Sequence, residues 1–421
     1  MNCEILAVGT ELLLGNTVNT NAAELSELLA GLGINVFWHT VVGDNPARLR
    51  DAVAIARSRA DLILTTGGLG PTYDDLTKNV LAEAFRKKLV FHQEEADFLR
   101  RVYTSRGRPL TDNVMQQAWL PEGCHVFHNE WGTAPGCAFQ AAGVHVILLP
   151  GPPYECLPMF RACAAPYLAA LSGEVLVSRQ IRVFGLGESA VEAIFREEME
   201  HMANPSLATY AKEGEVMLRV TAKAATAAEA AAMCAPVVEK VTEVLGDIVY
   251  GVDVDSLEAA ALSLLKEKGL TFAAAESLTG GLIGARFTAL SGASAVFRGG
   301  AVTYCDEVKA GLLDIDPALI AQKHAVSEEV AAAMARGVRA AAGADLGLSA
   351  TGIAGPDTDD SGLPVGTVFV GLADGEKVWV RRLALGQNQG RSRIRTLAAN
   401  HAFDMLRRYL TGLPVLREGT F

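Results

Sequence analysis

Short apolar runs that end in glycine-rich turns alternate with longer helical stretches in two separate parts of the chain. In the first part such runs include "EILAVG", "DLILTTGG" and "HVILLPG", and helical stretches like "NAAELSELLAGLG" separate them. A strand buried on both faces reads as a continuous apolar run, and a helical crossover makes neighbouring strands parallel. The sequence therefore predicts two three-layer α/β domains, each with a mainly parallel sheet.

The 421 residues are long enough for several domains, and the patterns divide them into three. Residues 1–171 and 254–421 are the predicted α/β domains. Residues 172–253 read as strand, helix, a hairpin turning near Gly214, a helix and a last strand. This order predicts a small split βαβ, KH-like α+β domain that spaces or dimerises its neighbours.

A reciprocal capping pattern marks the last helix of the middle domain. Thr226 stands three residues before Glu229, just ahead of a helical stretch. In such a capping box each side chain bonds the backbone N–H of the other residue, so we expect a helix to begin there.

Composition limits the partners of this protein. The net charge is −11 and the pI is about 5.3, which argues against direct nucleic-acid binding. The short basic cluster of Arg100, Arg101, Arg106 and Arg108 is predicted to be a solvated loop. Seven cysteines without a C-x-x-C pair form neither a disulfide framework nor a zinc site. With no signal peptide and no apolar run of about 18 residues, we expect a cytoplasmic protein without membrane contact.

One corner of the third domain raises the question of catalysis. In "FAAAESLTGG" an apolar strand stops at Ser277, and Gly280 and Gly281 follow. Ser277 or Thr279 would cap the next helix on the plainer interpretation. Alternatively, Ser277 is a nucleophile, and the N–H groups from Thr279 to Gly281 stabilise an oxyanion.

A nucleophilic serine needs a base, and "TYCDEVK" supplies Lys309. The strand before it is expected to end near Cys305 and Asp306 to cap the next helix, with Lys309 in its first turn. The positive end of a helix and burial both disfavour a protonated amine, as a general base requires. Asp306 and Glu307 act in the opposite direction, and the alternative is a solvated helix lysine.

A third corner, "LSATGIAGP", follows another predicted strand. Ser349, Thr351, Gly352 and Gly355 are candidates for binding a phosphate or a sugar there, and an ordinary turn is the alternative. All three corners are expected at the carboxyl edge of one sheet, where α/β proteins bind ligands.

The first domain carries a glycine loop, "TTGGLGPTYDD", directly after a strand. No Gly-Lys-Ser/Thr follows, so it is not a Walker A loop. Backbone N–H groups around Gly67, Gly68 and Gly70 are expected to hold phosphate.

Four acidic residues follow strands of the same predicted sheet. Asp44, Asp74, Asp75 and Glu155 favour a divalent metal such as Mg²⁺, which neutralises a diphosphate, and K⁺ stays open as a further cation. Any one of these acids could instead cap a helix, Asp74 in particular.

Long motifs in a fixed order resemble a known family across essentially the whole chain. "AAAESLTGGLIGARFTALSGASAVFRGGAVTYCDEVK" and "SATGIAGPD" resemble the CinA C-terminal family, the bacterial nicotinamide mononucleotide (NMN) deamidases. "VGTELLLGNTVNTNAAEL", "TTGGLGPTYDDLT" and "LPGPPYE" are similar to the CinA N-terminal domain, which is related to molybdopterin-binding proteins.

The resemblance implies a cofactor-free hydrolysis of the NMN carboxamide to nicotinate mononucleotide and ammonia. Ser277 and Lys309 would form a Ser–Lys dyad, assisted by Tyr304. The chain has Leu278 where family members often have Cys, and Cys305 where they often have Ser. Both positions flank the dyad, so activity is expected to survive these departures.

Further site residues follow from the same resemblance. Arg391 is a candidate phosphate clamp, and the turn that would hold the ribose phosphate or carbonyl comprises Thr351, Gly352, Ile353, Ala354 and Gly355. In the first domain the resemblance implies a metal-dependent ADP-ribose pyrophosphatase, with Asp44 and Asp75 matching acids of the related motif.

The expected partners are small nucleotides, NMN and ADP-ribose, and family likeness suggests a homodimer. Two other interpretations stay open. One is an interaction protein in competence or DNA damage, and the other is an enzyme or carrier that binds molybdopterin.

Overall fold

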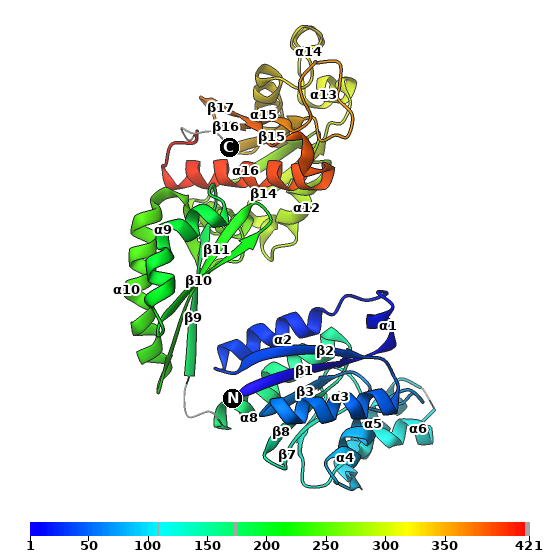
Figure 1. Ribbon diagram of the computed structural model, residues 1–421. Coiled ribbons are helices and arrows are strands. Elements are labelled where there is room, and N and C mark those ends of the chain that lie inside the picture. The colour runs from blue at the N-terminus through cyan, green and yellow to red at the C-terminus, as the bar shows by residue number, and fades with distance from the viewer. Residues whose placement is uncertain (108, 172–174, 417–421) are drawn as a thin grey trace. The chain divides into compact units, whose positions relative to one another are not determined.

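The computed structural model describes residues 1–107, 109–171 and 175–416, so Arg108 of the basic cluster lies outside the described residues. The chain forms two compact units: Met1–Val177 with Ala222–Ala232, and Ser178–Thr221 with Met233–Phe421 (Figure 1).

The first unit is built on a six-stranded sheet of order β2-β1-β3-β8-β7-β6. β2, β1, β3 and β8 are parallel, whereas β7 and β6 add antiparallel strands. The strands, including the separate pair β4 and β5, are β1 (Asn2–Val8), β2 (Asn35–Val42), β3 (Leu62–Thr66), β4 (Leu89–Phe91), β5 (Trp119–Pro121), β6 (His125–Phe127), β7 (Gly136–Ala141) and β8 (Val144–Leu149).

Helices cover both faces of this sheet. The helical segments of this part of the chain are α1 (Thr10–Leu13), α2 (Thr20–Gly31), α3 (Pro46–Arg59), α4 (Thr77–Ala84), α5 (Gln93–Ser105), α6 (Asp112–Met115), the 3-10 turn η1 (Gln116–Ala118), α7 (Pro153–Met159), the π turn η2 (Phe160–Ala164) and α8 (Ala165–Leu171). Arg100 and Arg101 lie in α5, so the prediction of a basic loop is wrong for these two residues.

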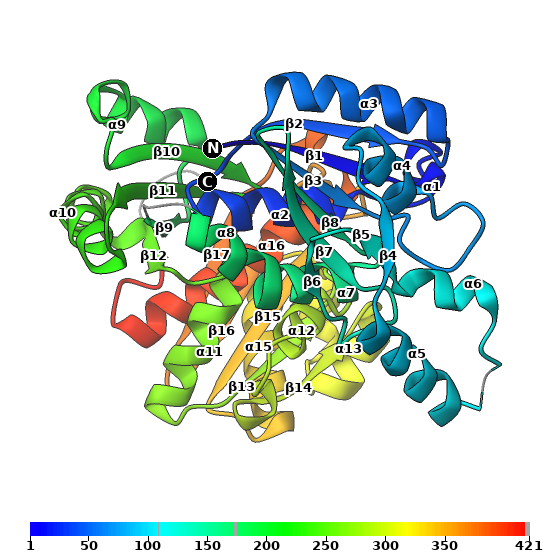
Figure 2. The same cartoon turned by 90° about the horizontal axis from the view of Figure 1, so that it is seen from below.

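The alternation of side chains along the strands explains the three layers. Ile5 and Leu64 pack into the hydrophobic cluster with α2 and α7, whereas Leu6 and Ile63 pack with α3 and α4. Successive residues of a strand point to opposite faces, so a strand that is apolar throughout is buried on both sides. Figures 1 and 2 show α2 and α3 on opposite sides of β1 and β3.

A four-stranded sheet of order β10-β11-β9-β12, most of which belongs to the second unit, comes next in the chain. Its elements are β9 (Val175–Val183), α9 (Glu188–His201), β10 (Ser206–Lys212), β11 (Glu215–Ala224), α10 (Ala227–Leu245), the 3-10 turn η3 (Gly246–Ile248) and β12 (Val249–Val252). The predicted hairpin is confirmed, since β10 and β11 pair antiparallel around Gly214 at φ 77°. The capping box is also confirmed, because Thr226 and Glu229 each accept the other's backbone N–H at 3.2 Å.

A five-stranded mixed sheet of order β14-β13-β15-β16-β17 follows. β14, β13 and β15 are parallel, and β16 and β17 are antiparallel. The elements are α11 (Leu257–Lys268), β13 (Phe272–Glu276), α12 (Leu282–Thr288), η4 (Ala293–Ala295), β14 (Phe297–Val302), α13 (Asp306–Leu313), α14 (Pro317–Lys323), α15 (Glu328–Ala342), β15 (Leu346–Gly352), β16 (Thr367–Ala373), β17 (Val378–Ala384), η5 (Gln387–Gln389) and α16 (Arg391–Thr411).

This sheet also lies between two helical layers. Phe272 and Ala274 pack with α11, α12 and α16, whereas Ala273 and Ala275 pack with α13, α14 and α15. Figure 1 shows α15 and α16 on opposite faces of β15. Arg407 of α16 also donates to the backbone carbonyls of Asp247 and Val249 in the four-stranded part.

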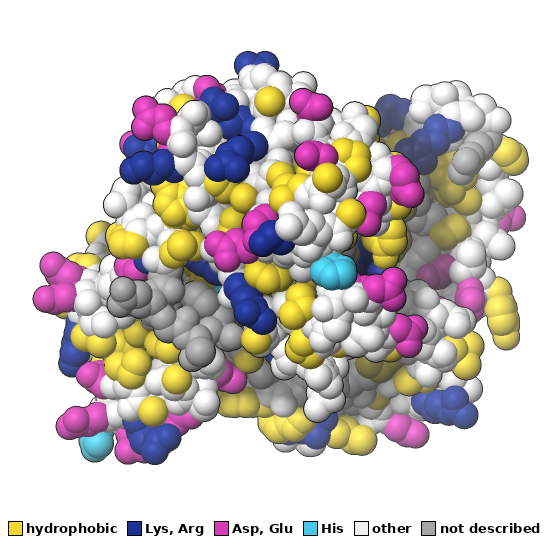
Figure 3. All heavy atoms as spheres, turned by 90° about the horizontal axis from the view of Figure 1, so that it is seen from above, with side chains coloured by type: hydrophobic (Ala, Val, Ile, Leu, Met, Phe, Trp, Pro, Cys, Tyr) yellow, Lys and Arg dark blue, Asp and Glu magenta, His cyan; other side chains and the backbone are white. Residues whose placement is uncertain are grey.

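Acidic and basic side chains are interspersed on the face drawn in Figure 3. Among the described residues no helix is long and apolar enough to cross a membrane.

Candidate active sites

Three strand ends of the five-stranded sheet meet at one edge. β13 lies between β14 and β15 and is parallel to both, with Glu276 opposite Val302 and Ala350. The residues that follow these strands therefore lie side by side at their carboxyl ends, as the sequence predicts. The backbone pairing continues past β13, because the Ser277 N–H donates to the Ala350 carbonyl at 2.9 Å.

Ser277 does not cap the following helix. α12 begins at Leu282, and the residue at its N-cap position is Gly281, which has no side chain with which to cap the helix. The Glu276 carboxylate instead accepts the N–H groups of Gly281, Ile283 and Gly284 at 2.8–3.0 Å. The cap interpretation of Ser277 and Thr279 is therefore wrong, which removes the plainer reason for a serine at this corner.

The corner that carries Ser277 is held from α16. Arg395 donates to the carbonyl of Leu278 at 3.1 Å and to that of Thr279 at 2.6 Å. Gly280 and Gly281 have φ of 57° and 94°, in the left-handed region that glycine adopts most easily. The Gly280 N–H donates to the Ser277 carbonyl, and the Gly281 N–H donates to the Glu276 carboxylate. Among the described contacts, the backbone N–H groups of Leu278 and Thr279 have no acceptor.

Lys309 is buried, with 2% of the residue exposed, so the alternative of a solvated lysine is wrong. β14 ends at Val302 rather than near Cys305, and Cys305 rather than Asp306 is at the N-cap position of α13. Lys309 is consequently the fourth residue of the helix. Among the described residues its ammonium group has one partner, the Asp306 carboxylate at 3.4 Å, and it makes no hydrogen bond to Ser277.

Arg391 joins two of the three corners. Its guanidinium donates to the Tyr304 hydroxyl and to the Gly355 carbonyl, both at 2.8 Å. Tyr304 follows β14 and is 60% exposed, and Gly355 follows β15. The structure thus brings together three of the residues that the sequence analysis proposed for substrate binding and catalysis.

Ser349 and Thr351 lie within β15 and not after it, which corrects the sequence interpretation. Both are fully buried, and their hydroxyl groups donate to the carbonyls of Ala331 and Ala325. These hydroxyls therefore stabilise the packing of β15 against its neighbours. Gly352 also lies within β15, as its last residue, so the segment that leaves the strand begins with Ile353, Ala354 and Gly355.

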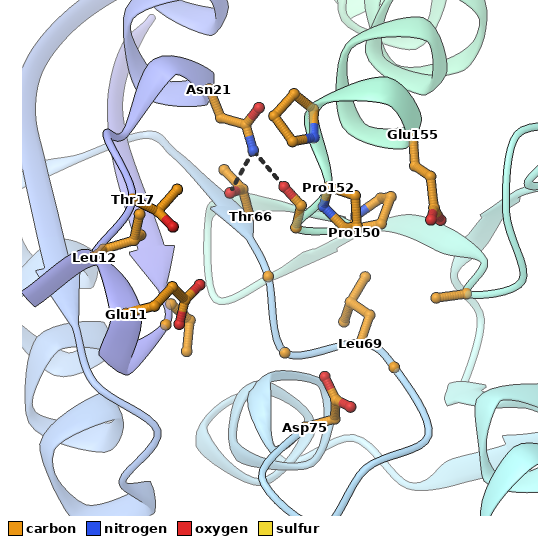
Figure 4. A pocket seen from close by; sticks show the side chains of 18 of the residues that line it. Glu11, Leu12, Thr17, Asn21, Thr66, Leu69, Asp75, Pro150, Pro152 and Glu155 are labelled. Carbon is orange, nitrogen blue, oxygen red and sulfur yellow. Dashed lines mark hydrogen bonds between the residues drawn. The ribbon is translucent and has the colours of Figure 1, made fainter. Parts of the chain in front are cut away.

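The first unit has a cavity of about 500 Å³ at the carboxyl ends of β1, β2, β3 and β8. The predicted glycine-loop residues and acids all line it: Gly67, Gly68, Gly70, Asp44, Asp74, Asp75 and Glu155. Figure 4 shows Asp75, Leu69 and Glu155 around this cavity, with Asn21 on another side.

Glycine is required by close contacts in the loop. A Cβ atom at Gly67 would lie 2.2 Å from the Val8 carbonyl oxygen, and one at Gly68 would lie 2.1 Å from the Thr77 hydroxyl. Both residues also have positive φ. The loop backbone is therefore pressed against β1 and α4, while its other side lines the cavity.

Each of the four acids accepts a hydrogen bond from another residue of the unit. Asp44 accepts the Thr10 N–H at 2.8 Å, and Glu155 accepts the Asn129 amide at 2.7 Å. Asp74 and Asp75 both accept the Thr72 hydroxyl, and this bond lowers the pKa of Asp74. Asp74 does not cap α4, because Leu76 is at the N-cap position and no side chain caps it.

These acids do not form a preformed metal cage. Among the described residues, no group of three or more His, Cys, Asp or Glu side chains is placed to hold a metal ion. The sequence could show that the acids share a sheet edge, but it could not show how far apart their carboxylates lie.

Sequence reasoning missed Asn21, which lines the cavity and is 6% exposed. Its amide group donates to the Gly151 carbonyl at 2.7 Å and to the Thr66 hydroxyl at 3.4 Å (Figure 4). Its Oδ1 atom has no described partner, so it is available to accept a hydrogen bond from a ligand. An asparagine in an N-terminal helical turn gives no signal of this kind.

Comparison with known proteins matches all three parts of the chain. Residues 4–170 match a probable molybdopterin binding domain, residues 178–251 the damage-inducible protein CinA KH domain, and residues 254–410 the CinA C-terminal domain. A CinA-like protein of Dictyoglomus turgidum is 46% identical over 98% of this chain and all of its own length. The chain belongs to the CinA family.

Two further proteins are similar to this chain over different lengths. A CinA-like protein of Kosmotoga olearia is also 46% identical, over 98% of this chain and its own full length. A crystal structure of CinA from Thermoplasma acidophilum is 33% identical, with a TM-score of 0.37. The match covers 39% of this chain and 98% of the Thermoplasma acidophilum chain.

Proposed function

We propose that the C-terminal part of this CinA family member hydrolyses the carboxamide of NMN to nicotinate mononucleotide and ammonia. The observation that carries the proposal is that one sheet edge carries both a buried lysine and a strand-end serine that caps no helix. Both follow neighbouring parallel strands of one sheet, and the resemblance to NMN deamidases falls on the same two residues.

The reaction needs a nucleophile and a proton carrier. Ser277 Oγ attacks the amide carbon while Lys309 accepts its proton, and Lys309 then donates that proton to the departing ammonia. Water hydrolyses the resulting acyl-serine by the same route, so one water is consumed for each ammonia released. The free N–H groups of Leu278 and Thr279 are the candidate donors to the oxyanion.

Arg391 is suited to the phosphate of NMN. Two of its N–H groups bond to Tyr304 and Gly355, and a guanidinium has five donors. The remaining donors can bind phosphate while the first two fix the position of the side chain.

Ammonia release from NMN tests this function. We expect release by the wild-type protein and a loss of about a thousandfold or more in Ser277→Ala and in Lys309→Ala. Circular dichroism confirms that both variants are folded. Release that persists in either folded variant would exclude the dyad, and no release by the wild type would exclude the function.

We further propose that the first unit cleaves ADP-ribose to AMP and ribose 5-phosphate. The cavity that combines a glycine loop with acids at the carboxyl ends of four parallel strands supports this proposal. Both substrates are breakdown products of pyridine nucleotides, so the two activities would act on related compounds.

The proposed metal would enter with the substrate. Mg²⁺ is commonly bound by one or two carboxylates together with substrate phosphates, which does not need a group of three protein ligands. Asp75 and Asp74 lie beside the glycine loop and are the candidate ligands. When bound, the metal would neutralise charge on the diphosphate.

AMP release from ADP-ribose tests the second activity. We expect release with Mg²⁺ and a fall of at least about a hundredfold with EDTA, restored by added metal. Release that is unaffected by EDTA would contradict a metal-dependent site. Binding of molybdopterin without AMP release would instead favour a carrier function, which the match of residues 4–170 supports.

A further inference from the structure

One guanidinium contacts two successive peptide groups at the corner after β13. Arg395 of α16 donates from Nε to the Leu278 carbonyl at 3.1 Å and from Nη2 to the Thr279 carbonyl at 2.6 Å. The two bonds use the fixed fork of donors that arginine has and lysine lacks. The side chain thus sets the position of two neighbouring carbonyls together.

Each of these carbonyls shares a peptide group with the N–H of the next residue. The Leu278 carbonyl and the Thr279 N–H form one amide, and the Thr279 carbonyl and the Gly280 N–H form the following one. Because the amide is delocalised, a cation that draws electron density toward its oxygen makes its N–H a stronger donor. Arg395 therefore acts directly on the Thr279 N–H, which has no acceptor among the described contacts.

A second path leads from the same guanidinium to the Leu278 N–H. The Gly280 N–H, which belongs to the amide of the Thr279 carbonyl, donates to the Ser277 carbonyl at 3.1 Å. The Ser277 carbonyl in turn shares its amide with the Leu278 N–H. Hydrogen bonds in such a chain polarise one another. Both candidate oxyanion donors are therefore polarised from one side chain, one through a single peptide group and the other through two.

The far end of the corner is held by a buried carboxylate. Glu276 is 1% exposed and accepts the N–H groups of Gly281, Ile283 and Gly284. Residues 277–280 are therefore fixed between this anion and the guanidinium. Their two N–H groups without an acceptor are held in place before a substrate arrives, as electrostatic stabilisation of an oxyanion requires.

We propose that Arg395 is a positioning residue of the amidase, which holds the Leu278 and Thr279 N–H groups and polarises them toward the oxyanion that forms when Ser277 attacks. Arg395 itself touches no substrate. This inference rests on the proposed hydrolysis of NMN. The amide oxygen carries more negative charge in the tetrahedral intermediate than in bound NMN, so the polarised donors act mainly on the transition state. The effect of Arg395 should appear in kcat and not in KM.

Steady-state ammonia release from NMN by the full-length protein tests the proposal. We expect Arg395→Gln to lower kcat about a hundredfold or more and to leave KM within about threefold of the wild-type value. Arg395→Lys keeps the charge but not the fork, so its kcat should lie between the two. Arg393→Gln is the matched control, because Arg393 is an exposed residue of the same helix, and both constants should be unchanged.

Added guanidinium separates polarisation from a purely structural role. In folded Arg395→Ala, millimolar guanidinium chloride at constant ionic strength should raise kcat about fivefold or more, because it restores charge-assisted hydrogen bonds to the two carbonyls. Urea has a similar shape and similar donors but no charge, and it should not raise kcat. If neither Arg395→Gln nor Arg395→Ala folds, the kcat and KM of Arg395→Lys decide between the same outcomes.

The inference is overturned if folded Arg395→Gln keeps the wild-type kcat, or if its KM rises and its kcat does not fall. The latter result would make Arg395 a substrate-binding residue. Equal rescue by urea and guanidinium would show that the charge has no role and would also overturn it. A wild type that releases no ammonia would refute the proposed hydrolysis, and this inference with it. An active wild type with an unimpaired Arg395→Gln would refute the inference alone.

Discussion

At the scale of single residues, the burial of Lys309 costs free energy of folding, and the side chain makes few hydrogen bonds that would offset that cost. Its side-chain nitrogen is removed from water, yet its one described partner is the Asp306 carboxylate at 3.4 Å. A buried polar group with so few hydrogen bonds destabilises a fold, and catalytic sites are where such costs are retained. Stability and activity should therefore respond in opposite directions when Lys309 is replaced.

We predict that Lys309→Met abolishes ammonia release and raises the free energy of unfolding by about 1–3 kcal/mol. Urea denaturation measures the stability, and NMN turnover measures the activity. Lys323→Met is the control, because that lysine is 43% exposed and pairs with Glu329 at the surface. A variant that loses both activity and stability would show that Lys309 has a structural role.

At the scale of elements, α16 is fixed to β17 through a buried polar network. Arg381 of β17 donates to the Asp404 carboxylate at 2.9 Å and to His401 Nδ1 at 3.2 Å. Burial, and then the neighbouring Arg381, lower the pKa of His401 to about 3, while Asp404 acts in the opposite direction. His401 is therefore neutral in the folded protein and accepts a hydrogen bond.

This pKa shift predicts acid sensitivity of the second unit. Below the ordinary histidine pKa of about 6.5 the unfolded chain takes up a proton at His401, and the folded chain does not until about pH 3. Stability should fall as the pH falls through this window, by about 2–3 kcal/mol at pH 4.5 from this group alone. Hydrogen exchange of α16 peptides at pH 7 and pH 4.5 measures it, and His401→Gln should show a smaller difference. Equal differences would refute the assignment.

The strands at this site could be predicted from sequence because each signal is local. An apolar run with glycines after it places Ser277 at the end of β13, and parallel pairing then brings the three corners to one edge. The ends of β14 and β15 could not be placed, since Thr303 and Ser349 fit a strand and a turn equally well. Pairing with a neighbouring strand decides such positions.

The contacts that hold the corner were not predictable. Arg395 meets the carbonyls of Leu278 and Thr279 across more than a hundred residues of chain. Glu276 caps α12 from inside a strand, whereas sequence patterns expect a cap just before the helix. Long-range hydrogen bonds of this kind depend on the finished fold.

At the scale of the whole molecule, the two proposed sites belong to different compact units. The residues that line the cavity at the glycine loop all lie in the first unit, and Ser277, Lys309 and Arg391 all lie in the second. Residues without a shared partner generally contribute independently. The two activities should therefore be separable by single substitutions in one polypeptide.

We predict that Ser277→Ala loses ammonia release from NMN and keeps AMP release from ADP-ribose within about twofold. Asp75→Ala should keep ammonia release and reduce AMP release at least about a hundredfold, because the metal loses a carboxylate ligand. Both assays are run on each purified, folded variant and on the double variant, which should lack both activities. If Ser277→Ala also loses AMP release, the sites are coupled or are one site, and a protein with two independent hydrolase centres is the wrong description.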